Sequence, residues 1–322
     1  MTTTDPRADP HAVPPAVPPH TEQDAPAPRV RTEPAHRLSP SPRGGRGWRI
    51  TVTLIASLVV GLLLLGLAGM SLTSWAINRG YQDVPATYEL GTPDSITLTS
   101  HVAEVTVMPS SEVDQVTVAL VDPGATELPP DSATARAQVS IEEGATGIVL
   151  DVRQPGVNRF AGLLEEHRDV LLVVPTRHTM ALDITSNVGG IDASGEFTSL
   201  TVRSDVGDIR LRGVSAPEGL TATGGVGGID VATDGSIPAG ITLTSDMGDV
   251  SLALPTDAGG EVTITSDVGE VDVTAPGEAR RTVVATSEVG TVTVDPQVAD
   301  AAGESVGTLT VTTSVGDIRV SR

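Results

Sequence analysis

The sequence contains no cysteine, no lysine and only six aromatic residues among its 322 positions. Without cysteine, the chain cannot form disulfides, use a thiol nucleophile or build a cysteine metal site. With so few aromatic side chains, a buried core has to be filled by small and β-branched residues. Such residues suit a narrow core of fixed width, and they are typical of strands.

Charge is divided unevenly along the chain. Residues 1–49 contain seven arginines and five acidic residues, whereas residues 80–322 contain 12 arginines and 36 acidic residues, a net charge of −24. A surface this acidic repels nucleic acid and anionic lipid, which argues against nucleic acid as a partner. We interpret the excess of carboxylates as a means of keeping an apolar repeat soluble.

The N-terminal quarter of the sequence predicts a membrane anchor. Residues 1–47 hold 11 of the 24 prolines and few apolar clusters, so we expect a disordered, Pro-rich cytoplasmic tail. Residues 48–78 predict a single transmembrane helix, because the stretch from 50 to 78 is uncharged and exceeds the roughly 20 residues that a span needs. A cleaved signal peptide is the weaker alternative, since the apolar run starts late and ends without an A-x-A site.

The charges around this segment predict its orientation. Arg43, Arg46 and Arg49 precede it, whereas Asp83 and Glu89 follow it. The positive-inside rule therefore places the N-terminus in the cytoplasm and the C-terminal domain outside the cell membrane. Residues 79–95 are expected to form a short tether between the anchor and that domain.

A short phrase recurs through the C-terminal half: a small hydroxyl residue, any residue, an apolar residue and glycine. The clearest copies are Ser204–Gly207, Ser245–Gly248, Ser266–Gly269 and Ser287–Gly290, and looser copies end at Gly189, Gly227 and Gly316. The steps between successive glycines are 18, 20, 21, 21, 21 and 26 residues. A period near 21 residues indicates a repeat architecture.

Apolar residues also occupy fixed positions around each glycine, which we number as position 0. Positions −7, −5, −1, +2 and +4 are apolar in every copy; around Gly207 they are Leu200, Val202, Val206, Ile209 and Leu211. Spacing by two is the strand period, so we expect these columns, −1 included, to form one buried face. Their parity changes at the glycine, which predicts a corner there with positive φ. Position −3, mostly serine, is expected to fill the inside of the corner and to bond to nearby backbone.

These features predict an all-β fold, with residues 96–322 forming an extracytoplasmic β-solenoid of about 21-residue repeats. Each rung would pair with the next at ~4.8 Å, giving a rod of about 29 Å over the six steps. An antiparallel meander, with each phrase as a hairpin loop, is the alternative. Residues 96–107 match the columns as an early copy in which Ala103 replaces the glycine, and further strand-like runs lie at 115–121, 137–143, 147–153 and 169–175.

Stretches such as Thr201–Gly213 and Thr265–Thr274, each with a glycine-centred phrase and alternating apolar residues, resemble the bacterial "putative adhesin" β-strand-repeat family, also called Toast-rack-like. The resemblance covers roughly Ile96 to Arg322, and its specificity lies in the recurrence of a short motif. It implies a β-solenoid-like domain outside a membrane anchor, linked to surface attachment or to envelope-stress sensing. It implies no catalytic residues.

Two patterns point weakly to chemistry. Gly303–Gly307 matches the GxSxG nucleophile elbow, but that motif works on a strand–turn–helix and Leu309 begins another strand. The three histidines after the apolar run are His101, His167 and His178, and their spacing matches no metal motif. We interpret them as surface residues.

Acidic residues near the corners form a third pattern. Asp246, Asp267 and Glu288 share one column, and Asp249 and Glu270 share another. Stacked carboxylates could bind calcium, yet Gly225, Gly228 and Ser314 interrupt the columns. We favour turn-forming acids and assign no catalytic, cofactor-binding or metal-ligating residue.

Three functions remain open at this point. The favoured one is a non-enzymatic, membrane-anchored surface domain that binds envelope components or a partner protein for adhesion or scaffolding. The alternative is a sensing or signalling component, in which residues 1–47 report the state of the envelope. A polysaccharide-acting enzyme on a solenoid is the least favoured, because no distinctive cluster of acids marks one face.

Overall fold

The computed structural model describes residues 53–61, 63, 80–145, 147–155, 167–234, 239–256, 258–277, 280–299 and 305–322. Residues 53–61 are helical, and they lie within the expected span 48–78, most of which falls outside the described residues, as does the expected tail 1–47. Within the described ranges, no helix has both the length and the apolar character of a membrane span. The transmembrane anchor therefore stays a prediction.

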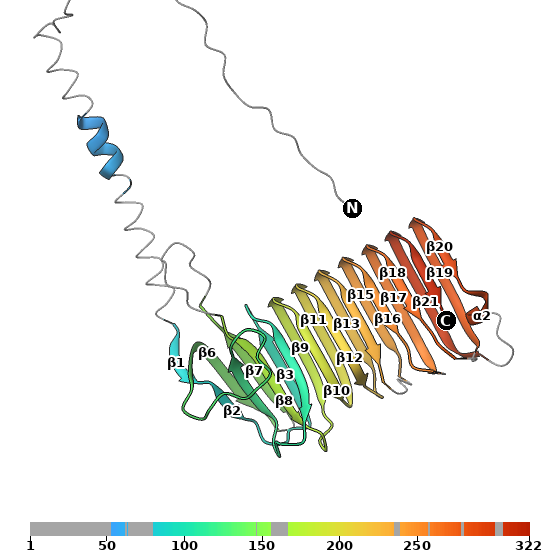
Figure 1. The fold of residues 1–322 in the computed structure, drawn as a ribbon, viewed down its shortest axis with the longest axis horizontal. Helices are drawn as coiled ribbons and strands as arrows, with labels where there is room; N and C mark the ends of the chain where they lie inside the picture. The colour runs from blue at the N-terminus through green and yellow to red at the C-terminus, as the bar shows by residue number, and fades with distance from the viewer. Residues whose placement is uncertain are drawn as a thin grey trace, which may run out of the picture. The chain divides into compact units, whose positions relative to one another are not determined.

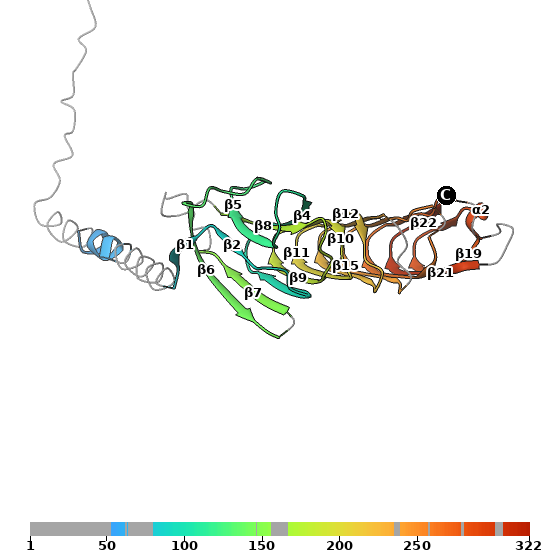
Figure 2. The same cartoon turned by 90° about the horizontal axis from the view of Figure 1, so that it is seen from below.

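The part of the chain from residue 80 onward is all-β and forms two sheets of eleven strands each (Figures 1 and 2). The first sheet has the order β1 (Gln82–Pro85), β6 (Thr134–Glu143), β7 (Gly147–Arg153), β3 (Ser95–Ser100), β9 (Ala181–Val188), β11 (Ser199–Val206), β13 (Leu220–Val226), β15 (Ile241–Met247), β17 (Gly260–Val268), β21 (Ser305–Val315) and β19 (Arg280–Val289). The second has the order β2 (Thr87–Glu89), β5 (Thr117–Val121), β8 (Asp169–Pro175), β4 (Val105–Ser110), β10 (Ile191–Glu196), β12 (Ile209–Ser215), β14 (Ile229–Thr233), β16 (Val250–Ala253), β18 (Val271–Thr274), β22 (Ile318–Ser321) and β20 (Val292–Val294). A short helix, α2 (Pro296–Ala299), packs against β19.

Each repeat contributes one strand to each sheet, and successive repeats stack in parallel as rungs. Leu200 of β11 pairs with Leu182 of β9 on one side and with Leu220 of β13 on the other, so equivalent columns lie in register. The same parallel pairing joins β10, β12 and β14 in the second sheet. This pattern confirms the solenoid-like stacking and rules out the hairpin meander for these rungs, since hairpins pair antiparallel.

The order of the rungs departs from the chain order at both ends. The rung β3–β4 lies between β7–β8 and β9–β10, and the rung β21–β22 lies between β17–β18 and β19–β20 (Figure 1). Our expectation that each rung simply follows the previous one is therefore wrong for the last two repeats. The chain skips a rung position in the regular 21-residue step from Gly269 to Gly290, and the 26-residue step to Gly316 then returns it to the position between β17–β18 and β19–β20.

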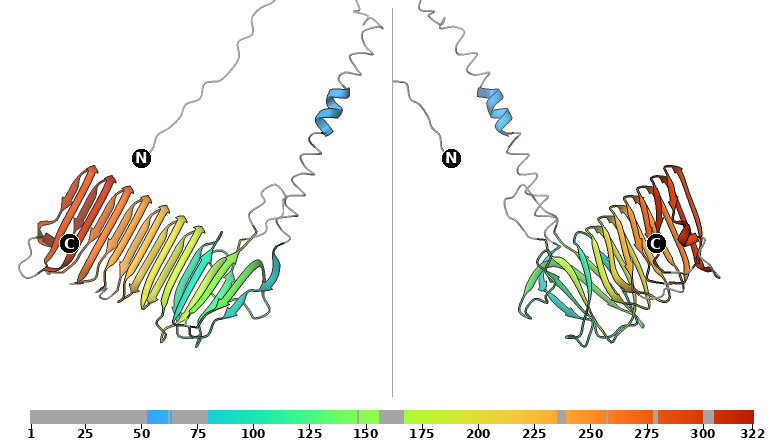
Figure 3. Two further views of the ribbon diagram at one scale, coloured as in Figure 1. Left: turned by 180° about the vertical axis from the view of Figure 1, so that it is seen from behind. Right: turned by 45° about the vertical axis from the view of Figure 1, so that its right-hand side comes forward.

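The two ends of the stack differ in how they finish. At one end β1 and β6, and likewise β2 and β5, add antiparallel strands beyond the rung β7–β8 (Figure 3). β1 and β2 lie within residues 79–95, the expected tether. At the other end, β19 and β20 each have one neighbouring strand in the described part of the chain.

The corner glycines stack directly on one another, as the sequence predicts. Gly248 has φ of 146°, and a Cβ added to it would lie 2.0 Å from the carbonyl oxygen of Gly227 in the preceding rung. Every glycine of this column meets a similar backbone oxygen, so glycine is required for close approach as well as for its φ. Ala103 stands at the start of the column. In the rung before it, β7 ends at Arg153 and β8 begins at Asp169, so these two strands are not joined by two residues as the strands at the glycine corners are.

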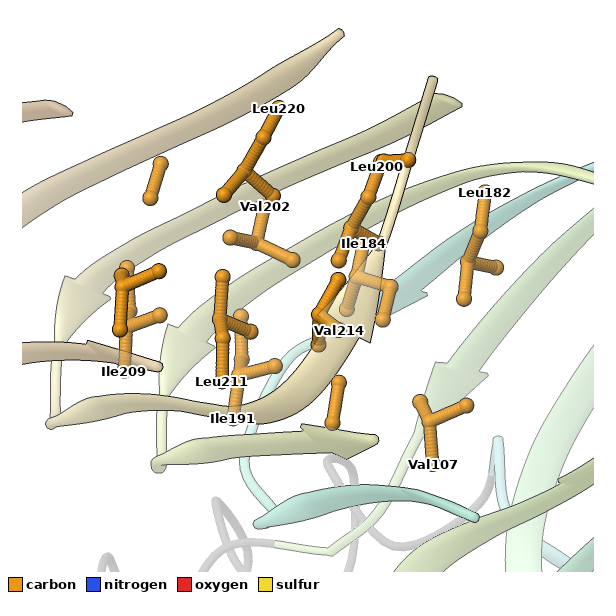
Figure 4. Packing of buried hydrophobic residues seen from close by; sticks show 14 of the residues in the cluster. Val107, Leu182, Ile184, Ile191, Leu200, Val202, Ile209, Leu211, Val214 and Leu220 are labelled. Carbon is orange, nitrogen blue, oxygen red and sulfur yellow. The ribbon is translucent and has the colours of Figure 1, made fainter. Parts of the chain in front are cut away.

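The core lies between the two sheets. Leu182, Ile184 and Leu200 from the first sheet point toward Ile191 and Leu211 from the second (Figure 4). At positions −7, −5, +2 and +4, side chains are at most 4% exposed in six consecutive rungs of the stack, from β9–β10 through β21–β22. The serines at −3 are buried in the inner rungs, and Ser287 in the outer rung is half-buried. Ser186, Ser245 and Ser287 donate to glycine carbonyls at 3.0, 3.3 and 2.8 Å. The expected backbone bonding is thus confirmed at these corners.

The column at −1 is the exception, and our expectation that it is buried is wrong. Its members are between 45% and 64% exposed. The chain starts to turn before this position is reached. Ser204 is the last residue of β11 that faces the core, and Val206 is already carried outward on the corner.

Candidate functional site: an apolar ladder at the corner

The exposed −1 residues form a continuous line along one edge of the stack, which we call the apolar ladder. In spatial order it consists of Val188, Val206, Val226, Met247, Val268, Val315 and Val289. Each member pairs in register with the next, so neighbouring side chains are one strand spacing apart, ~4.8 Å. The ladder therefore extends over about 29 Å from Val188 to Val289.

Backbone hydrogen bonds hold the ladder in place. The amide of every corner glycine except Gly290, which lies in the outer rung, donates to the carbonyl of the ladder residue in the next rung. Examples are Gly207 to Val226 at 2.9 Å, Gly227 to Met247 at 3.0 Å and Gly248 to Val268 at 2.9 Å. These carbonyls are thus already engaged along the stack. The edge presents side chains on a fixed backbone and is closed to an additional strand.

A first acidic column borders the ladder at position −2. Its acidic members are Asp205, Asp246, Asp267 and Glu288, and all four are exposed. Asp205 forms an ion pair with Arg203 at 3.0 Å. Among the described residues, no arginine or histidine lies within salt-bridge distance of Asp246, Asp267 or Glu288.

A second acidic column borders the ladder at position +1, and its carboxylates cap the corner of the next rung. Asp208 accepts from the amide of Gly228 at 3.0 Å, Asp249 from the amide of Glu270 at 2.9 Å and Asp317 from the amide of Thr291 at 2.7 Å. These bonds give the acids a structural role, which agrees with their interpretation as turn formers. In the described ranges, no group of three or more histidine and acidic side chains is placed to hold a metal ion.

Beside the second column, the outer face of the second sheet is hollowed into an open groove of about 440 Å³. Asp230, Asp249 and Asp272 line it, and Arg210 and Arg319 come from the rungs at its two ends. Arg210 pairs with Asp208, and Arg319 pairs with Glu270 at 3.0 Å. Both pairs are about half exposed, so solvent screens them and each adds little to stability. The acidic side chains that line the groove outnumber the two arginines, so the groove is acidic overall.

The repeat architecture matches a known protein family. A family model described as Toastrack DUF4097 matches residues 151–321, more than half of the chain. The chain belongs to this family. The match begins within β7 and extends to β22, so the early rung β3–β4 and the capping strands β1, β2, β5 and β6 lie before it.

Solved structures give a weaker likeness. A "putative cell adhesion protein" from Clostridium sporogenes is 13% identical, with a TM-score of 0.32, and the match covers 74% of this chain and 99% of the other. A "putative adhesin" from Bacteroides fragilis is 10% identical, with a TM-score of 0.35, and the match covers 74% and 97%. At these scores neither likeness supports a functional argument. No curated protein matches the chain.

The residues with possible chemistry lie apart from one another in the Toastrack fold. Ser305 of the GxSxG match begins β21, and the chain continues as strand to Val315, so the helix that a nucleophile elbow needs does not follow. His101 contacts Asp151 at 3.4 Å and Asn187 at 3.2 Å at the corner of the rung β3–β4. His178 lies within 2.8 Å of the carbonyl of Pro93, beside a hollow of about 270 Å³ that Phe197 helps to line.

The sequence predicted that the ladder residues are buried, because they are apolar and lie an even number of positions from −7 and −5, which face the core. One signal could have identified it. Position −3 is a small hydroxyl residue in most copies, which shows that the core narrows there and ends before −1.

Proposed function

We propose that the chain is a non-enzymatic, membrane-anchored surface protein whose Toastrack stack binds an envelope component or a partner protein. The observation that carries this proposal is the apolar ladder, seven half-exposed side chains in register between two acidic columns. A stack of similar rungs repeats one surface along its length, and solenoid proteins use such extended surfaces for binding. Scattered single apolar residues are ordinary on a protein surface, whereas a contiguous apolar patch marks an interaction site.

The anchor is the second part of the proposal. The uncharged run 50–78 and the arginines before it support a single span with the N-terminus in the cytoplasm and the stack outside. The acidic surface of residues 80–322 suits this arrangement, because it keeps the stack away from anionic headgroups.

Protease treatment of intact cells tests the topology. The full-length chain carries one epitope tag at each end, and we expect the C-terminal tag to be removed while the N-terminal tag survives. Loss of the N-terminal tag alone would show that the stack is inside the cell and would end the surface-binding proposal.

A photo-crosslinking residue at Met247, compared with one at Val149 on β7, then tests binding: a partner captured from Met247 alone supports the proposal.

A further inference from the structure

The apolar ladder has the dimensions of a docking surface for one secondary-structure element. Its seven side chains are held on a backbone that is hydrogen-bonded from rung to rung, and they extend over about 29 Å in a straight series. Each is about half exposed, so each keeps apolar surface that a partner can cover. The question is which partner fits.

Charge selects the class of partner. The ladder lies between the exposed acids at −2 and the acids at +1, and residues 80–322 carry 12 arginines against 36 acidic residues. A second copy of this chain would place acidic columns against acidic columns, and an anionic lipid surface would be repelled in the same way. A partner with basic side chains on both sides of an apolar strip complements the edge instead.

Geometry selects the element. A strand cannot add along the ladder, because the carbonyls of its residues already accept hydrogen bonds from the corner glycines. An α-helix satisfies its own backbone, and its turns repeat every 5.4 Å against the ~4.8 Å step of the ladder. About 20 helical residues would cover the whole ladder.

We infer that the apolar ladder is the docking site for a basic amphipathic α-helix of a partner protein, laid across the rungs. This inference rests on the proposed function, since it specifies what the ladder binds. The helix places apolar residues at i, i+3, i+4 and i+7 on the ladder, and arginines or lysines on either side reach the acids at −2 and +1. The carboxylates of Asp246, Asp267 and Glu288 receive these basic side chains on one flank.

A designed helix serves as the probe. It is a fluorescent 20-residue peptide of leucine, alanine and arginine with an apolar stripe flanked by arginines, and a scrambled peptide has the same composition without the stripe. Binding is followed by fluorescence anisotropy to the full-length chain in nanodiscs of zwitterionic lipid, with empty nanodiscs as the blank. We expect saturable binding of the striped peptide, at least tenfold tighter than that of the scrambled one.

Two variants locate the site. Met247→Asp places a charge at the centre of the ladder and should weaken binding at least tenfold, whereas Val149→Asp, at a valine of similar exposure on β7, should leave it unchanged. Circular dichroism confirms that both variants keep the β signal.

Charge removal gives the second test, and it does not depend on how Met247→Asp folds. Exposed acids at −2 are neutralised together as Asp246→Asn, Asp267→Asn and Glu288→Gln, and binding should weaken and lose much of its salt dependence. The matched control neutralises three exposed acids elsewhere, Glu112→Gln, Asp114→Asn and Asp131→Asn, and should bind like the parent.

The outcomes separate this inference from the function on which it rests. Equal binding of the scrambled peptide, equal loss in the control triple variant, or no binding at 1 mM peptide (~4 kcal/mol) would overturn the helix-docking inference. Dimerisation of the chain that Met247→Asp abolishes would also overturn it, in favour of a second copy. None of these results touches the protease test, so the surface function stands or falls separately.

Discussion

The middle of the stack and its two ends use the same repeat in different ways. From β9 to β18 the rungs follow chain order, and every strand has a parallel neighbour on both sides. At the ends the chain doubles back, so that β3–β4 and β21–β22 become inner rungs while β7–β8 and β19–β20 lie outside them. β22 is thus held between β18 and β20, which protects it from fraying.

How deeply a side chain is buried depends on the position of its rung in the stack and not on its residue type. Val273 of β18 and Val294 of β20 both occupy position +4, yet Val273 is fully buried and Val294 is partly exposed. The outer rung β19–β20 has no further strand to cover it in the described ranges, and α2 covers part of it, with Val298 buried. The same apolar column therefore supports a closed core in the middle and an open one at this end.

A substitution at a middle corner should have the largest effect. Gly248→Ala adds a Cβ that would lie 2.0 Å from the Gly227 carbonyl oxygen at a φ of 146°. We expect it to lower the free energy of unfolding by about 3 kcal/mol or more, through backbone strain and forced separation of the rungs. The midpoint of denaturant unfolding, followed by circular dichroism, measures this.

Two controls define the cause of that effect. Gly219→Ala has a φ of 131° but no atom within 4 Å of the added Cβ, so it should show the strain alone, about 1–3 kcal/mol. Gly290→Ala meets the Gly316 carbonyl oxygen at 2.0 Å but lies in the outer rung, which can move away. If Gly290→Ala lowers the free energy of unfolding as much as Gly248→Ala does, the middle and the end of the stack are equally rigid, and the difference described between them is wrong.

The next effect compares matched valines. Val273→Ala should cost about 2 kcal/mol, because it leaves a cavity in a closed core, whereas Val294→Ala should cost less than about 1 kcal/mol. Unfolding midpoints under the same conditions give the difference. Equal losses would show that the outer rung is packed as tightly as the middle, against the exposure of Val294.

The sequence predicts the parts of the fold that the repeat itself encodes. The glycine corners, the strands on either side and the buried columns −7, −5, +2 and +4 all follow from spacing and residue type, as does the early rung at 96–107. The burial of Ser245 follows from its small size at a core-parity position next to a corner.

The order of the rungs at the ends could not be predicted in the same way. The apolar columns are alike in every repeat, so any rung can pair with any other. The pairing of β21 with both β17 and β19 therefore cannot be predicted from the columns. The 26-residue last step was visible, but its length alone does not show that the chain turns back along the stack. The ladder was missed for a related reason, since an apolar residue such as Val206 has the same parity whether the strand continues inward or begins to turn.

A smaller effect distinguishes corners within the middle of the stack. The hydroxyl of Ser245 donates to the carbonyl of Gly248 at 3.3 Å, whereas the buried hydroxyl of Ser266 has no hydrogen-bond partner among the described residues. Ser245→Ala should therefore cost about 1 kcal/mol, and Ser266→Ala should be neutral or slightly stabilising. Thermal melts of the two variants compare them directly. A larger loss for Ser266→Ala than for Ser245→Ala would contradict the hydrogen-bonding difference.

The smallest effect lies where the early rung meets the middle of the stack. Asp183 on β9 stays in contact with solvent on the outer face, but β3 and β11 on either side cover part of its carboxyl. This partial burial raises the pKa of Asp183 above its ordinary value of 3.8. The folded state then holds the proton more tightly than the unfolded state, so the carboxyl's contribution to stability is present below pH 3.8 and is lost as pH rises through the folded-state pKa. Asp183→Asn removes that loss and should stabilise the chain at pH 7 by about 0.5 kcal/mol or less, with no gain at pH 3. Asp267→Asn, at an exposed acid, controls for the reduced net charge. A gain for Asp183→Asn that persists at pH 3, or that Asp267→Asn matches at pH 7, would show that desolvation at this junction is not its cause.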